Sequence, residues 1–239
     1  MAKLQHSQEE IFSSYSWWDK SCLLNHITKE RCDYIESCVD KVFGREALRQ
    51  QEVLEIGCGG GLICENLLQR GAVTVGIDPS HKALEAARTH TQQSGFGHNA
   101  YYEHGYAEAL PYANGSFSVI VCLDVLEHVS DLPKTIREIT RVLAPGGIFI
   151  FDTINRTLIA RIALIWIGER FFRNSGLLPG LHNYHDFIKP QELQGLLAAN
   201  QLQVREMVGF MPHFNNGHLS LGPGWFKGVS YIGYATKDR

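Results

Sequence analysis

The sequence lacks the features that mark several large classes of protein. No apolar run approaches the roughly 18 residues that a membrane-spanning helix needs, and no basic-then-apolar leader stands at the beginning. A net charge of −3 gives no sign of the clustered basic face that binds nucleic acid. The six cysteines lack the paired spacing of a zinc site, so we interpret them as reduced thiols in a cytoplasmic protein.

The composition of the chain suits one α/β domain. Its 239 residues are 44% hydrophobic, which is enough for a sizeable core. Helical and strand periodicities alternate through the first two-thirds, and two strands then follow with little helix between them. This pattern predicts a doubly wound, mostly parallel sheet with helices on both faces and an antiparallel last strand. We expect residues 1–239 to form a single domain.

The most informative stretch is 53–61, which reads VLEIGCGGG. Its apolar beginning predicts a buried strand, and the strand enters a tight glycine turn. Gly57, Gly59 and Gly61 let the backbone turn sharply and let a ligand approach main-chain atoms closely. The next predicted strand ends at Asp78, whose carboxylate can accept hydrogen bonds from both hydroxyls of a ribose. The sequence therefore predicts a site for a ribose-bearing ligand.

A second cluster of polar residues follows the apolar run 117–123, which predicts a central parallel strand buried on both faces. Asp124, Glu127 and His128 come directly after it. Ligands of open α/β sheets bind at the carboxyl ends of the strands, so we expect these three side chains at the reaction centre. Their alternative role is structural, with Glu127 and His128 capping the following helix.

Two further stretches are unusually apolar for their surroundings. The first holds Trp17 and Trp18, and it predicts either a lid over the pocket, within an N-terminal helical region 1–45, or a helix packed on the core edge. The second, 156–173, mixes large apolar side chains with arginines within a predicted insertion, 154–190. Such a segment is typical of a helix lying in a membrane interface, although a buried crossover helix or a substrate lid would share its composition.

Eight segments, read in order, resemble a known family over nearly the whole chain. The sequence is similar to the S-adenosylmethionine (SAM)-dependent O-methyltransferases of ubiquinone biosynthesis, which belong to the class I methyltransferases. The segments are WWD, VLEIGCGGGL, GAVTVGID, CLDVLEHV, APGG, INR, HDFIKP and LGPG. VLEIGCGGGL and APGG are common to many methyltransferases, whereas WWD, LEHV, INR, FIKP and LGPG are much more specific.

The resemblance implies a Rossmann-like sheet of seven strands in the order 3-2-1-4-5-7-6, with the seventh antiparallel. It implies SAM contacts at Arg31, Gly57, Asp78 and Leu123. The guanidinium of Arg31 would then pair with the methionyl carboxylate of SAM. The implied methyl acceptor is a phenolic hydroxyl of a polyprenylated dihydroxybenzene, a quinol-like small molecule. A peripheral position at the inner face of a membrane, through 156–173, would bring the site to such a substrate.

The family also implies that Asp124, Glu127 and His128 bind a divalent cation such as Mg²⁺, which would stabilise a catecholate oxygen as a Lewis acid. Without metal, His128 would serve as general base. Asp124 departs from the Glu usual in the bacterial enzymes, and the shorter side chain weakens the expectation of a metal.

Three other functions remain as alternatives at this point. SAM could methylate oxygen, nitrogen or carbon of a soluble small molecule, because acceptor pockets differ mainly in the N-terminal helices and the insertion. A NAD-dependent oxidoreductase is disfavoured, since Leu62 replaces the last glycine of the dinucleotide fingerprint and no Tyr-x-x-x-Lys pair occurs. A non-catalytic SAM-binding protein would not need the cluster at Asp124.

Overall fold

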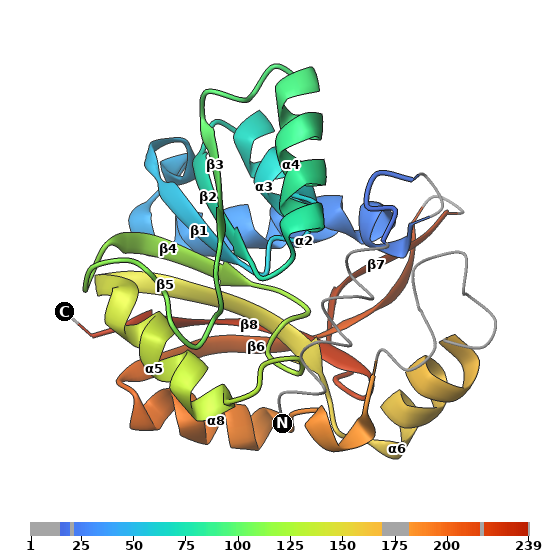
Figure 1. Ribbon diagram of the computed structural model, residues 1–239. Coiled ribbons are helices and arrows are strands. Elements are labelled where there is room, and N and C mark those ends of the chain that lie inside the picture. The colour runs from blue at the N-terminus through green and yellow to red at the C-terminus, as the bar shows by residue number, and fades with distance from the viewer. Residues whose placement is uncertain (1–14, 20–21, 169–181, 216–217, 239) are drawn as a thin grey trace.

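The computed structural model describes residues 15–19, 22–168, 182–215 and 218–238. Helices lie on both sides of one twisted sheet, as Figure 1 shows. The principal helices are α2 (Leu23–Phe43), α3 (Leu62–Gln69), α4 (His81–Gln93), α5 (Leu132–Val142), α6 (Leu158–Ala160) with its continuation Arg161–Gly168, and α8 (Pro190–Ala199). The strands are β1 (Glu52–Ile56), β2 (Val73–Asp78), β3 (Ala100–His104), β4 (Phe117–Cys122), β5 (Leu143–Ile154), β6 (Leu202–Asn215), β7 (His218–Gly224) and β8 (Ser230–Lys237).

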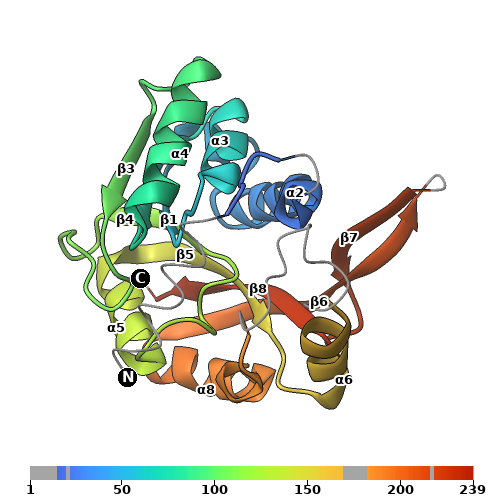
Figure 2. The ribbon, with the colours of Figure 1, turned by 45° about the vertical axis from the view of Figure 1, so that its right-hand side comes forward.

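The sheet has the order β3-β2-β1-β4-β5-β8-β6-β7. Strands β1 to β5 pair in parallel, and β8 runs antiparallel between β5 and β6. The predicted order 3-2-1-4-5-7-6 is thereby confirmed, with β8 as the antiparallel seventh strand of the prediction. The eighth strand was not predicted. It is β7, which pairs with β6 as an antiparallel hairpin and projects as an arm in Figure 2.

Each face of the sheet carries its own apolar core because side chains alternate along the central strands. Leu54 of β1 and Ile120 of β4 belong to the core that α5 and α8 cover. Val53 and Val119, their neighbours in the same strands, belong to the core that α2 and α3 cover. All four side chains are fully buried, which explains why these strands read as continuous apolar runs.

The segment Ala144–Pro145–Gly146–Gly147 corrects one prediction. The sequence indicated a turn before a strand from Ile148 to Asp152, but these residues lie within β5. The pairing of β4 with β5 shifts register between Phe117 and Val119, so an irregularity in the ladder accommodates the Pro–Gly–Gly bend. The strand ends at Ile154, and its last residues lie beside the end of β4.

The fold thus gathers four strand ends at one edge of the sheet. The loops after β1, β2 and β4 and the last residues of β5 all lie there, because the four strands are parallel neighbours. This is the edge at which open α/β sheets bind ligands.

No helix among the described residues has both the length and the apolar character to cross a membrane.

Candidate functional site

The glycine turn after β1 is held by the acid at the end of β2. Oδ2 of Asp78 accepts the backbone N–H of Gly59 at 2.9 Å, and Oδ1 accepts that of Ser80 at 2.8 Å. The N–H of Gly57 donates to the carbonyl of Ile77 at 2.7 Å. Asp78 therefore links the two turns on which the ligand prediction rests, and the structure brings the predicted residues together.

Close packing explains why glycine is needed at two of these positions. Gly57 has φ 72°, and a Cβ there would lie 2.2 Å from Cγ2 of Val125. The loop after β4 therefore lies directly against the loop after β1. Gly61 has φ 82° and begins α3, and its Cβ would meet Tyr102 at 2.8 Å and Ala87 at 3.0 Å. Gly61 thus lets α3 approach β3 and α4 closely.

Two tryptophans seat the N-terminal segment on the glycine turn. The indole of Trp17 lies over Gly59 and Gly60, where added Cβ atoms would come within 2.4 Å and 2.2 Å of it. Trp18 donates from Nε1 to the carbonyl of Gly60 at 3.0 Å. Its ring stacks on His90 of α4, with centroids 3.4 Å apart and planes at 3°. The segment before α2 therefore covers the turn instead of packing only on the core edge.

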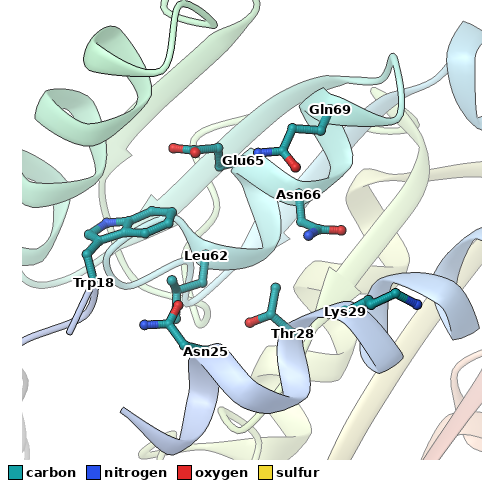
Figure 3. A pocket seen from close by; sticks show the side chains of 8 residues that line it. All are labelled: Trp18, Asn25, Thr28, Lys29, Leu62, Glu65, Asn66 and Gln69. Carbon is teal, nitrogen blue, oxygen red and sulfur yellow. The ribbon is translucent and has the colours of Figure 1, made fainter. Parts of the chain in front are cut away.

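A cavity of about 140 Å³ opens between α2 and α3, beside the glycine turn. Figure 3 shows Trp18 at one end of it, next to Leu62 at the start of α3. Its volume is below the roughly 300 Å³ at which sites for drug-sized ligands begin. It is a polar hollow beside the turn, and it is lined by Trp18, Asn25, Thr28, Lys29, Leu62, Glu65, Asn66 and Gln69.

Arg31, for which the family resemblance implied a contact with SAM, has two acidic partners within the protein. It lies on α2 and is buried, and its Nη2 contacts Oδ2 of Asp124 and Oδ2 of Asp152, each at 2.7 Å. Oδ1 of Asp152 also accepts the backbone N–H of Asp124 at 2.6 Å. The three side chains form a closed ring across α2, β5 and the loop after β4. The hydrogen on Nε of Arg31, also buried, has no acceptor among the described residues.

Glu127 is the most deeply buried of the predicted catalytic residues. It is 4% exposed, and its Oε2 accepts the hydroxyl hydrogen of Thr153 at 2.8 Å. Burial raises the pKa of Glu127 to about 7, and the nearby charge of Asp124 adds to the increase. A carboxyl with this pKa is half-ionised near neutral pH, which suits a group that takes up a proton.

His128 has the opposite shift. Burial lowers the pKa of its imidazole to about 3, and the neighbouring His182 lowers it further. His128 is therefore neutral at pH 7 and a weaker base than Glu127. The alternative role of both residues as helix caps is wrong, because Asp131 caps α5 by accepting the N–H of Lys134 at 2.9 Å.

The predicted metal site is not assembled. Asp124 is paired with Arg31, and one oxygen of Glu127 accepts from Thr153. Within the described ranges, no three His, Cys, Asp or Glu side chains converge as ligands for an ion. The arrangement of Asp124, Glu127 and His128 therefore does not fit Mg²⁺, the cation that the family resemblance implied.

Leu123 lies where the sequence put it, buried directly after β4 at 7% exposure. Two residues of the site were missed. Asp152 was read only as the end of a strand, and Thr153 was not considered. The signal for Asp152 was present, since an acid at the carboxyl end of an otherwise apolar parallel strand faces either a ligand or a buried partner.

The predicted insertion presents an apolar surface. Residues 169–173 of the predicted interfacial stretch lie outside the described residues. The loop before β8 is hydrogen-bonded to the segment between β5 and α6, since Nδ2 of Asn155 donates to the carbonyl of Lys227 at 2.6 Å. Arg161 lies over the ring of Tyr184 at 5.4 Å. Four large apolar side chains are exposed on α6 and this loop, namely Leu158 (67%), Ile159 (52%), Ile162 (49%) and Trp225 (83%).

Comparison with known proteins agrees with this geometry. Residues 54–151 match the model of the methyltransferase domain family. A ubiquinone biosynthesis O-methyltransferase of Sinorhizobium medicae is 35% identical over 229 residues, covering 91% of each chain. A protein of the same name from Pseudomonas fluorescens is 34% identical over 230 residues, covering 93% of this chain and 94% of its own.

Solved structures show the same fold at lower sequence identity. A SAM-dependent methyltransferase of Thermotoga maritima superposes with a TM-score of 0.64 at 20% identity, covering 98% of this chain and 99% of its own. A magnesium protoporphyrin IX methyltransferase of Synechocystis, solved with S-adenosylhomocysteine, gives 0.62 at 19% identity, covering 98% and 94%. Because the relatives above exceed 30% identity over almost their whole length, the chain belongs to the ubiquinone biosynthesis O-methyltransferases, a family of SAM-dependent enzymes.

Proposed function

We propose that this enzyme methylates a phenolic hydroxyl of a polyprenylated dihydroxybenzene, a precursor of ubiquinone. The observation that carries the proposal is the contact between Val125 and Gly57, which brings the acids after β4 against the glycine turn after β1. A methyl donor on that turn would meet an acceptor held at those acids. Holding the reacting oxygen and the methyl group in line is the main contribution that such a site can make.

The residues around the turn fit SAM, which would supply the electrophilic methyl group. The turn offers main-chain atoms without side chains at Gly57 and Gly59. Asp78 stands at the end of β2, in the position from which an acid meets ribose hydroxyls. Arg31 carries a buried N–H with no acceptor among the described residues, and a carboxylate would satisfy it. Leu123 would add an apolar wall.

Glu127 is the best candidate for the proton acceptor. A phenol has a pKa near 10, so little phenolate exists at neutral pH and the site must weaken the O–H bond. The raised pKa of Glu127, about 7, matches this task better than the lowered pKa of His128, about 3. The negative charge of Asp124 supports the task, since it helps to raise the pKa of Glu127.

The N-terminal segment would act as a lid. Trp17 lies on the face of the glycine turn, and Trp18 fastens the segment to α4 through its stack on His90. A lid in this position would exclude water from the donor, as closure does in many enzymes. Opening at the two tryptophans would be required for SAM to enter.

The exposed apolar side chains support a membrane-bound acceptor over a soluble one. Apolar side chains with flanking arginines suit a segment lying in a membrane interface. In this chain Leu158, Ile159 and Ile162 are exposed on α6 and its continuation, and Trp225 is exposed in the loop before β8. We therefore place the enzyme in the cytoplasm, at the inner face of a membrane. Flotation with anionic liposomes tests this, and a Leu158→Ser, Trp225→Ser variant should remain with the soluble fraction.

The acceptor is tested by incubation with labelled SAM and a series of catechols with and without a prenyl tail. Methylation that requires the tail supports the proposal, with loss of activity in Glu127→Gln as the control for chemistry at this site. Equal transfer to tailless catechols would favour a soluble acceptor instead. Transfer to none of the phenols, by an enzyme that binds SAM, would contradict the proposed acceptor class.

A further inference from the structure

The ring formed by Arg31, Asp124 and Asp152 raises a question about charge. One guanidinium already contacts two carboxylates at 2.7 Å each. A third carboxylate, that of the methionyl group, could accept the N–H on Nε of Arg31, but it would approach an arginine whose charge is already balanced. Burying a further negative charge there is costly unless one of the present partners leaves.

The two aspartates differ in how firmly they are held. The side chain of Asp152 is 3% exposed, and it accepts the N–H of Asp124 as well as contacting Arg31. The side chain of Asp124 is 38% exposed, and none of the described hydrogen bonds ends at its carboxylate beyond the contact with Arg31. Asp124 can therefore turn toward solvent, whereas Asp152 would stay buried away from water without its contact to Arg31.

The backbone of Asp124 also has an uncommon conformation. Its φ of 54° lies in the left-handed region, which most residues with a side chain avoid and which Asp and Asn enter more readily than the others. The N–H bond to Asp152 and the ion pair with Arg31 hold this conformation. Residues held in sparsely populated backbone regions are concentrated at ligand-binding sites and switch regions.

We propose that Arg31 exchanges carboxylates when SAM binds, keeping Asp152 and giving up Asp124 for the methionyl carboxylate. Asp124 would thereby be released at the reaction centre only after SAM is in place, which couples donor binding to the readiness of the acceptor side. This inference rests on the proposed function, because it takes SAM as the ligand of Arg31.

The exchange predicts an unusual direction for the change in ligand affinity when a charged side chain of the site is replaced. Removing the charge of Asp124 should strengthen binding, since the incoming carboxylate no longer displaces a partner of Arg31. The probe is S-adenosylhomocysteine, whose neutral sulfur avoids any attraction between Asp124 and a sulfonium. The matched probe is 5′-methylthioadenosine, which has the same nucleoside and thioether but no carboxylate.

Calorimetry with Asp124→Asn should give an affinity for S-adenosylhomocysteine about tenfold higher than that of wild type. The affinity for 5′-methylthioadenosine should be unchanged. Asparagine adopts positive φ readily, so the fold should persist, and Asp124→Gly provides a second variant without strain. Asp33→Asn is the control, because Asp33 lies on α2 together with Arg31 but pairs with Arg70, at 2.7 Å.

The arginine must be required for the gain. In an Arg31→Gln background, Asp124→Asn should leave the affinity for S-adenosylhomocysteine unchanged, which a double-mutant cycle measures. Equal or weaker binding in both Asp124 variants, with wild type still binding the probe, would overturn the exchange and leave the proposed function intact. A wild type that binds neither S-adenosylhomocysteine nor SAM would instead refute the proposed function.

Discussion

Replacing Gly60 by alanine tests how the N-terminal segment sits on the glycine turn. Gly60 does not have the positive φ of its neighbours, so alanine brings no backbone strain. Its Cβ, however, would lie 2.2 Å from Cγ of Trp17. Carbon atoms pack at roughly 3.5–4.0 Å, so Trp17 would have to move by more than an ångström. Such overpacking costs about 1–3 kcal/mol.

The assay is chemical unfolding of four proteins, namely wild type, Gly60→Ala, Trp17→Gly and the double variant. We expect Gly60→Ala to lower the free energy of unfolding by about 2 kcal/mol in the presence of Trp17. In the Trp17→Gly background the cost should vanish, because the three atoms nearest to the added Cβ are Cβ, Cγ and Cδ1 of Trp17 and glycine removes them all. Equal costs in the two backgrounds would refute the contact on which the lid proposal rests.

Gly195→Ala supplies the control for this cycle. Gly195 lies within α8, and a Cβ there would meet nothing within 4 Å. The same substitution should therefore stabilise the protein by up to about 1 kcal/mol, through the higher helix propensity of alanine. Limited proteolysis gives a second measure, since Gly60→Ala alone should expose the segment before α2.

Three further predictions concern buried carboxyls. The profile of kcat/KM against pH should rise and level above about 7, as Glu127 ionises. Glu127→Gln should remove this ascending limb and lower kcat by about 100-fold. His128→Asn should leave the midpoint of the limb unchanged, because His128 is neutral over this range. Thr153→Val should move the limb to higher pH, because its hydroxyl stabilises ionised Glu127; an unmoved limb would mean that another group titrates. Burial raises the pKa of Glu55 in the folded protein to about 8. The contribution of this carboxyl to the free energy of unfolding should therefore be fully present below about pH 4.5 and be lost as the pH rises through about 8. Glu55→Gln, which retains an acceptor for the N–H of Cys64, should therefore be more stable than wild type by about 2 kcal/mol at pH 8 and by less at pH 5, as urea unfolding measures.

The parts of the site that were predictable from sequence are those whose physics is local. A glycine turn between an apolar strand and a helix is visible in adjacent residues of the sequence. Asp78 was predictable in the same way, because it ends the next apolar run. The doubly wound sheet followed from the alternation of strands and helices, whereas the order of its strands followed from the family resemblance. β7 escaped prediction because its stretch contains Gly and Pro, which weaken strand periodicity.

The parts that were not predictable depend on contacts between distant segments. Arg31 and Asp152 are 121 positions apart, and only the folded chain shows that one buried carboxylate holds both Arg31 and the N–H of Asp124. The difference between Glu127 and His128 is of the same kind. Burial raises the pKa of one and lowers the pKa of the other, and burial cannot be read from adjacent positions.

The central claim is that the glycine turn and the acid at the end of β2 hold the adenosyl donor. Calorimetric titration of SAM into wild type and Asp78→Ala tests it most directly, with circular dichroism to verify that the variant is folded. We expect wild type to bind and Asp78→Ala to lose about 100-fold in affinity, because the ribose loses its acceptor and Gly59 loses its hydrogen bond. An Asp78→Ala variant that binds SAM as tightly as wild type would contradict the account.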